Sequence, residues 1–133
     1  MKRYANAALV YALLAAAAGV FYREFTKIQG FTGRTTLSMV HTHYFALGTL
    51  LFLVLLALEK QLGFTDRAVG RILTVFHAGL NVTALTLLAR GIVQVLGTPL
   101  STALNASLSG VAGIGHILLG VSLVLKRYSM IGD

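Results

Sequence analysis

The sequence predicts an all-α integral membrane protein, a bundle of four membrane-spanning helices. Of its 133 residues, 56% are hydrophobic and only 11% are charged, and the mean hydropathy is +0.80. A soluble domain of this size needs charged side chains at roughly a quarter of its positions. The charged residues also divide the chain into long apolar stretches, each close to the length of about 20 residues that a spanning helix requires.

Charged residues mark the ends of the first two expected spans. The first span, residues 4–22, ends before Arg23. The second span, residues 36–58, contains no charged side chain and ends before Glu59. Inside lipid every backbone polar group needs a partner within its own segment, so both stretches are expected to be helices.

A turn signal separates the last two expected spans. The third span, residues 70–95, contains a charge-free run that Arg90 ends, and the sequence Gly97-Thr98-Pro99 follows it as a helix break. The fourth span, residues 102–125, is again free of charge. Because the connections are short, neighbouring helices should be antiparallel, and we expect one domain over residues 1–133.

The basic residues predict how the chain sits in the membrane. Four spans put both ends of the chain on one side. That side carries seven of the eleven basic residues, namely Lys2, Arg3, Lys60, Arg67, Arg71, Lys126 and Arg127. The other side carries the remaining four, Arg23, Lys27, Arg34 and Arg90. Since basic residues accumulate on the cytoplasmic side, we expect cytoplasmic termini in a bacterial cytoplasmic (inner) membrane. The charges form no patch, so nucleic acid is not an expected partner.

The four histidines are the candidate functional residues, because all of them fall inside the expected spans: His41, His43, His77 and His116. Ionisable groups within a membrane are costly and usually functional. No Asp or Glu lies within a span, so catalysis by a pair of carboxylates is not expected there. The chain has no cysteine, which excludes thiolate metal sites and a c-type haem.

His41 and His43 lie two positions apart, so at about 100° per residue they point to opposite faces of one helix. They cannot share one ion from that helix, but each suits a haem iron on its own face. His116 lies on a stripe of small residues, which indicates either close helix packing or the approach of a flat ligand. His77 aligns with Thr74 and Asn81, which indicates either an interhelical hydrogen-bond cluster or a ligand.

Depth predicts which histidines can pair. At about 1.5 Å per residue, His77 lies roughly 9 Å in from Arg71, and His116 lies roughly 15 Å in from Lys126. Within one chain, His77 with His116 is therefore the expected pair. His41 and His43 are expected nearer the outer face, where His41 of one protomer could meet His43 of another.

Two resemblances add to these expectations. The segment His41-Thr42-His43-Tyr44 resembles the His-x-His-Tyr of the haem–copper oxidase catalytic subunit, in which three arcs of four helices surround a pseudo-threefold axis. That resemblance implies one such arc per chain. It further implies a homotrimer whose haem b groups are shared between His41 of one protomer and His43 of the next. The paired copper ligands, the three-arc chain and the carboxylate proton channels of that subunit are not recognisable here.

The whole chain also resembles a family of small four-span bacterial membrane proteins of unknown function. The segments that carry this second resemblance are Gly19-Val20-Phe21-Tyr22-Arg23-Glu24-Phe25, His41-Thr42-His43, Phe76-His77-Ala78-Gly79-Leu80 and Gly113-Ile114-Gly115-His116.

The favoured hypothesis is a haem b protein of the bilayer that transfers electrons, with a redox partner or quinone, or that binds O₂ or NO. The basic groups of the outer side, Arg23, Lys27, Arg34 and Arg90, are candidates to pair with haem propionates. One alternative is a small transporter whose histidines bind copper or zinc ions or relay protons. Another is a structural subunit of a respiratory complex, in which the histidines only join helices.

Overall fold

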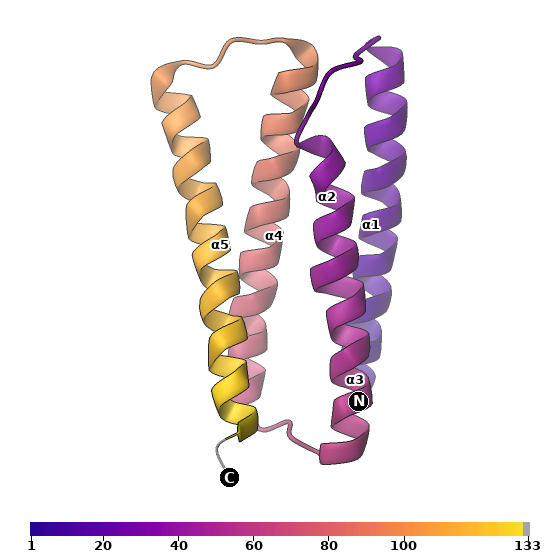
Figure 1. Ribbon diagram of the computed structural model, residues 1–133, viewed down its shortest axis with the longest axis vertical. Coiled ribbons are helices and arrows are strands. Elements are labelled where there is room, and N and C mark those ends of the chain that lie inside the picture. Colours follow the sequence, from indigo (N-terminus) through magenta and orange to yellow (C-terminus); the bar gives the residue numbers. More distant parts are fainter. Residues whose placement is uncertain (132–133) are drawn as a thin grey trace.

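The computed structural model describes the backbone of residues 1–131 and the side chains of residues 1–126. Its helices are α1 (Lys2–Ile28), α2 (Leu37–His43), the π-helical η1 (Tyr44–Leu50), α3 (Leu51–Leu62), α4 (Arg67–Leu96) and α5 (Thr102–Ile131). Because α2, η1 and α3 follow one another without a break, they form one continuous rod (Figure 1). Within the described residues four helices, counting the rod as one, are long and apolar enough to cross a membrane, which confirms the all-α, four-span prediction.

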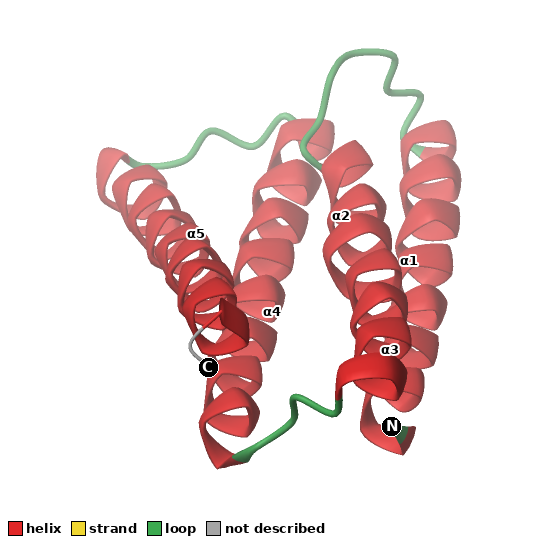
Figure 2. Cartoon of the chain, turned by 60° about the horizontal axis from the view of Figure 1, so that its bottom comes forward, coloured by secondary structure: helices red, strands yellow, loops and turns green. Residues whose placement is uncertain are grey.

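The four helices lie side by side in the order α5, α4, the α2–α3 rod and α1 (Figures 1 and 2). The largest helix contacts are those of α4 with α5, of α4 with α2 and of α1 with the rod. The N-terminus and the α3–α4 loop lie at one end, called here the termini end, and the other two loops lie at the distal end. In the apolar window of α4, 39% is buried, against 17% in α5. Helix α4 is therefore central, and α5 leaves most of its apolar surface to lipid.

Glycine and aspartate set the helix ends. Gly63 and Gly97 follow α3 and α4 with φ of 57° and 65°, the left-handed conformation that glycine adopts without strain. Asp66 caps α4, because its Oδ1 accepts a hydrogen bond of 2.7 Å from the Val69 N–H. The break expected at Gly97-Thr98-Pro99 is therefore confirmed.

The helices run past the charged residues that were expected to end them. Helix α1 continues to Ile28, beyond Arg23 and Lys27, and α4 begins at Arg67. Long basic side chains extend to the membrane surface while their backbone stays helical, so charge alone underestimates helix length. The side chain of Arg127, assigned to the cytoplasmic side from the sequence, lies outside the described residues.

One face of α1 forms much of the core. Its buried residues, Tyr4, Ala8, Tyr11 and Ala15, recur at helical spacing. Gly48 of η1 contacts the side chain of Tyr11 so closely that a Cβ at Gly48 would overlap it. The glycine therefore permits the close approach of α1 to the rod.

Candidate functional site

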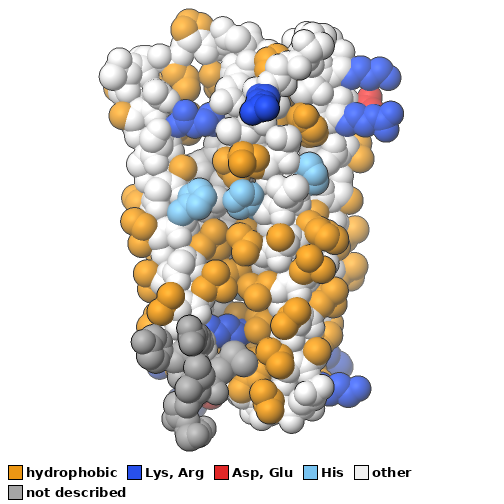
Figure 3. All heavy atoms as spheres, viewed as in Figure 1, with side chains coloured by type: hydrophobic (Ala, Val, Ile, Leu, Met, Phe, Trp, Pro, Cys, Tyr) orange, Lys and Arg blue, Asp and Glu red, His pale blue; other side chains and the backbone are white. Residues whose placement is uncertain are grey.

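Histidine side chains lie at nearly one level on the face of the molecule that Figure 3 shows. His41 and His43 belong to α2, His77 belongs to α4, and His116 belongs to α5. Their surroundings differ, and the difference separates one candidate pair from the other two histidines.

His43 and His116 face each other across the gap between α2 and α5. Their ring centroids are 6.2 Å apart, and the ring planes are nearly perpendicular, at 89°. The pair expected from depth, His77 with His116, is not formed, because His77 hydrogen-bonds to α1 instead. The structure therefore brings together two of the four predicted histidines, in a combination that the sequence did not indicate.

Hydrogen bonds determine which ring nitrogen carries the proton in His43 and in His116. The Nδ1 of His43 is 2.8 Å from the Met39 carbonyl oxygen, and the Nδ1 of His116 is 2.7 Å from that of Ala112. Because a carbonyl oxygen only accepts hydrogen bonds, each Nδ1 carries the proton. In the neutral ring the lone pair then lies on Nε2. Histidines that bind metals show this arrangement, in which the other ring nitrogen donates to a carbonyl or carboxylate.

Some glycines of α5 pack against α4, and others have no neighbouring atoms within 4 Å of an added Cβ. A Cβ at Gly115 would meet Thr83 of α4, and one at Gly79 of α4 would meet Leu118 and Leu119. Gly113, on the same stripe as His116, has nothing within 4 Å of such a Cβ. Close packing therefore explains Gly115 but not Gly113, and the helix face beside His116 is open.

The depth prediction paired His77 with His116 although they lie at different levels, and the expected fourth span ended one residue before Lys126. Helix α5 continues to Ile131, and Lys126 is buried, with its Nζ 5.6 Å from the Tyr4 ring centroid and 5.2 Å from that of Phe64. The contacts of Gly115 with Thr83 and of Gly79 with Leu119 put Lys126 close to the level of Arg71, so the counted depths of roughly 9 Å for His77 and roughly 15 Å for His116 were already different levels. Because α4 and α5 are antiparallel and Gly115 contacts Thr83, His116 lies about five residues beyond the level of His77, or roughly 7.5 Å.

His41 points away from His43, as the sequence predicted. Its ring lies beside Gly19 of α1, and it stacks on Tyr22 at a centroid distance of 6.4 Å and an interplanar angle of 18°. The Nδ1 of His41 is buried and has no hydrogen-bond partner among the described residues. The opposite directions of His41 and His43 are therefore confirmed.

His77 belongs to a hydrogen-bond network that joins three helices. Its Nδ1 is 2.6 Å from the hydroxyl of Tyr11, and the Asn81 amide donates to that hydroxyl at 3.2 Å. The Tyr44 hydroxyl donates to Asn81 Oδ1 at 3.0 Å. Since the Tyr11 oxygen already accepts from Asn81, its own hydrogen is available for His77 Nδ1. The interpretation of His77 and Asn81 as an interhelical cluster is confirmed, whereas Thr74 donates to the Gly70 carbonyl oxygen of its own helix.

The sequence did not indicate the two tyrosines as members of this network. Tyr11 lies in a run of alanine and leucine, where a single aromatic residue is typical of packing. Tyr44 is the first residue of η1, which the sequence did not indicate. A weak signal was present, because a tyrosine inside a span needs a partner for its hydroxyl group.

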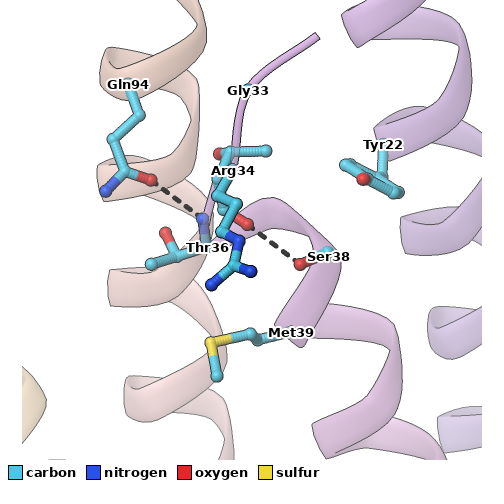
Figure 4. Close-up of a pocket in the computed structure, with 8 residues that line it drawn as sticks. Tyr22, Gly33, Arg34, Thr36, Ser38, Met39 and Gln94 are labelled. Carbon is cyan, nitrogen blue, oxygen red and sulfur yellow. Dashed lines mark hydrogen bonds between the residues drawn. The ribbon is translucent and has the colours of Figure 1, made fainter.

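Two arginines lie toward the distal end of the His43–His116 pair. Arg90 of α4 donates to Asn105 Oδ1 at 2.9 Å and to Ser109 Oγ at 2.8 Å. Ser109 is two helical turns from His116, roughly 10 Å along α5. Arg34 lines a cavity of about 450 Å³ at the start of α2, and Figure 4 shows its guanidinium group lying near Met39.

The Thr36 N–H fixes the amide of Gln94 at the edge of this cavity. It donates to Gln94 Oε1 at 2.8 Å (Figure 4). The other residues that line the cavity are Tyr22, Gly33, Thr35, Ser38 and Met39. The lining of the cavity is therefore mixed, with apolar and polar groups, and Arg34 is its charged residue.

The donor set limits the chemistry available. Among the described residues no group of three or more His, Asp or Glu side chains could hold a metal ion. Two imidazoles do not complete the four ligands that a structural zinc ion takes from protein side chains. They would be enough protein ligands for a haem iron, whose other four ligands come from the porphyrin.

Comparisons with known proteins give a family and no further relatives. No curated protein and no solved structure matches the chain. A protein family described as "Protein of unknown function (DUF2871)" matches residues 1–130. This match covers nearly the whole chain, and it agrees with the expected small membrane protein of unknown function. The chain, a multi-pass membrane protein by its four candidate spans, therefore belongs to the DUF2871 family.

Proposed function

We propose that this protein binds haem b between His43 and His116 and transfers electrons within the membrane. The observation that carries the proposal is the facing pair itself, with ring centroids 6.2 Å apart. A histidine nitrogen lies about 2.0–2.1 Å from a metal ion that it binds. Two imidazole rings that bind one ion from opposite sides therefore have centroids about 6 Å apart. Both Nδ1 atoms donate to backbone carbonyls, which leaves Nε2 for the iron.

The open surface beside His116 supports a flat ligand. Gly113 and Gly120 of α5 have nothing within 4 Å of an added Cβ. A porphyrin ring between α2 and α5 would lie against this helix face, where larger side chains would obstruct it. A small ion would leave the face uncovered.

Two histidine ligands favour electron transfer over gas binding. When both axial positions of the iron are filled by His43 and His116, no position remains for O₂ or NO. The chain also lacks carboxylates inside the expected spans, so proton-coupled chemistry has no carboxylate relay. The bound haem would supply the one-electron chemistry, and the protein would supply the ligands and their orientation.

Arg90 and Arg34 are the candidates to pair with the propionates. Arg90 already bridges to α5 through Ser109, on the stripe that carries His116. Arg34 lies near Met39, whose carbonyl oxygen accepts from His43. The other two cations proposed for this role are less suited, because Arg23 lies 3.9 Å from Glu24 and is largely exposed, and Lys27 lies in the last turn of α1.

A second arrangement uses His41 in a homotrimer, as the resemblance to the haem–copper oxidase subunit implies. One observation favours it, namely that His41 Nδ1 is buried and has no partner in the described part of the chain. In this arrangement each haem lies between His41 of one protomer and His43 of the next. Because His43 is used in both arrangements, His41 and His116 distinguish them.

We also propose that the termini end faces the cytoplasm of a bacterial cell. Lys2, Arg3, Lys60, Arg67 and Arg71 lie there, against four basic residues at the distal end. The rule that basic residues accumulate on the cytoplasmic side gives this orientation. The haem would then lie in the half of the membrane nearer the outside.

The absorption spectrum of the purified protein tests the haem proposal. We expect a Soret band and, after reduction, the bands of low-spin haem b, with no change on addition of carbon monoxide. His43→Ala and His116→Ala should each abolish this spectrum, whereas His77→Ala should retain it. A colourless wild-type protein that takes up no added haem would contradict the proposal.

His41→Ala separates the two arrangements. If the haem lies between His43 and His116 of one chain, this variant keeps its colour and its spectrum. If haem is lost from His41→Ala and His43→Ala but retained by His116→Ala, the shared trimer site is correct and the site within one chain is wrong. Cross-linking of the same samples gives the number of chains.

A further inference from the structure

We propose that the termini end binds an anionic glycerophospholipid. The headgroup phosphate would lie in a basic hollow formed by Arg3, Arg67 and Arg71, and one acyl chain would lie in an apolar groove between α4 and α5. This inference does not depend on haem, because the site is at the opposite end of α4 from Arg90.

The basic hollow lies between the start of α1 and the start of α4. Its volume is about 850 Å³, and it is lined by Arg3, Thr65, Asp66, Arg67, Gly70, Arg71 and Thr74. The one carboxylate in this set is that of Asp66, and it accepts a hydrogen bond from the Val69 N–H. In the described part of the chain, the only ion pair is that of Arg23 with Glu24. Three guanidinium groups and one carboxylate therefore line the hollow, and none of the three arginines forms an ion pair with that carboxylate.

An apolar groove begins where the hollow ends. Its volume is about 370 Å³, and it is lined by Ala68, Arg71, Ile72, Val75, Val121, Ser122 and Leu125. The Ser122 hydroxyl donates to the Leu119 carbonyl oxygen, so the groove offers little hydrogen bonding. Arg71 lines both the hollow and the groove, and the two are therefore adjacent.

This combination matches the chemistry of an anionic lipid. Arginine binds a phosphate through two parallel N–H···O bonds, and basic pockets between membrane helices bind anionic headgroups. The groove runs from Arg71 along the spanning part of α4, where an acyl chain lies. A soluble phosphate compound would fill the hollow and leave the groove empty, so the groove favours a lipid.

Native mass spectrometry of delipidated protein in a neutral detergent tests the site. We expect phosphatidylglycerol to bind at least 10-fold more tightly than phosphatidylcholine with the same acyl chains. The double variant Arg67→Gln/Arg71→Gln should lose roughly 30-fold in affinity for phosphatidylglycerol, about five-fold for each arginine. Arg23→Gln/Lys27→Gln, with the same charge change at the distal end, should leave binding unchanged. Equal affinity for the two lipids, or equal loss in both double variants, would overturn the proposal.

A second pair of measurements separates a lipid from a soluble phosphate ester. Val121→Trp fills the groove and keeps every arginine, and Val121 is 48% exposed, so the fold tolerates the change. We expect this variant to lose phosphatidylglycerol binding, and we expect glycerol 3-phosphate not to compete with the lipid. If Val121→Trp binds the lipid normally and glycerol 3-phosphate displaces it, the ligand is a soluble phosphate ester and the lipid proposal is wrong. The haem spectrum should be unchanged in Arg67→Gln/Arg71→Gln and in Val121→Trp.

Discussion

The Tyr11 hydroxyl lies 2.6 Å from Nδ1 of His77, and this contact joins α1 to α4 in the centre of the bundle. Asn81 extends the connection to η1 through the hydroxyl of Tyr44, the residue that follows His43. The network therefore helps to fix the rod that carries His43 relative to α4. It also keeps His77 Nδ1 bonded within the core.

Removing the Tyr11 hydroxyl should destabilise the protein without removing haem. Tyr11→Phe leaves His77 Nδ1 and one hydrogen of the Asn81 amide without a partner, and we expect a loss of about 1 kcal/mol in the free energy of unfolding. Denaturation by sodium dodecyl sulfate in mixed micelles measures it. Tyr22→Phe is the control, because no hydrogen bond of the Tyr22 hydroxyl is found among the described residues. Equal effects in both variants would contradict this role.

The close approach of α5 to α4 depends on Gly115. Gly115→Val places a branched side chain against Thr83, so we expect a destabilisation of about 1–3 kcal/mol. Because α5 would shift, haem content per protein should fall as well. Gly110→Val is the control, since nothing lies within 4 Å of a Cβ at that position. If haem content and stability are equal in the two variants, His116 is not positioned by this packing.

His116→Met should keep haem and change its redox potential. A methionine still provides an axial ligand, and iron with one His and one Met ligand has a higher potential than iron with two His ligands. Potentiometric titration of the reduced-haem band measures this shift. His116→Leu removes the ligand and should lose the low-spin spectrum. A potential that stays at the wild-type value in His116→Met would show that His116 does not contact the iron.

The cap of α4 gives a prediction independent of any ligand. Asp66→Ala removes the acceptor of the 2.7 Å bond from the Val69 N–H, and we expect a loss of about 1 kcal/mol in stability. Asp66→Asn keeps the acceptor and should retain most of that stability. Thermal unfolding in detergent, followed by circular dichroism, compares the two. If Asp66→Asn is as unstable as Asp66→Ala, the carboxylate acts by its charge and not as a cap.

Hydropathy and charge spacing were sufficient to predict the four spans, because they depend on the length of apolar runs. The π-helical η1 was not predicted, because the apolar pattern of a span does not distinguish π-helical from α-helical turns. The end of α5 was also misjudged. Lys126 is covered by Tyr4 and Phe64, and a buried lysine cannot be distinguished from a surface lysine by sequence.

The candidate site was predicted in part. The cost of histidine in lipid identified His43 and His116 as candidates, and helical geometry correctly separated the directions of His41 and His43. The pairing across helices was not predictable, because it depends on the vertical alignment of α4 with α5 through Gly79 and Gly115. The residue pattern of one helix does not show how that helix aligns with its neighbour.

Electron paramagnetic resonance of the oxidised protein tests most directly whether His43 and His116 ligate one haem iron. Their ring planes are 89° apart, so we expect the highly anisotropic low-spin ferric signal that perpendicular imidazole planes produce, and we expect His116→Ala to abolish it. A protein without a low-spin ferric haem signal, or a signal that His116→Ala leaves intact, would contradict the proposed site.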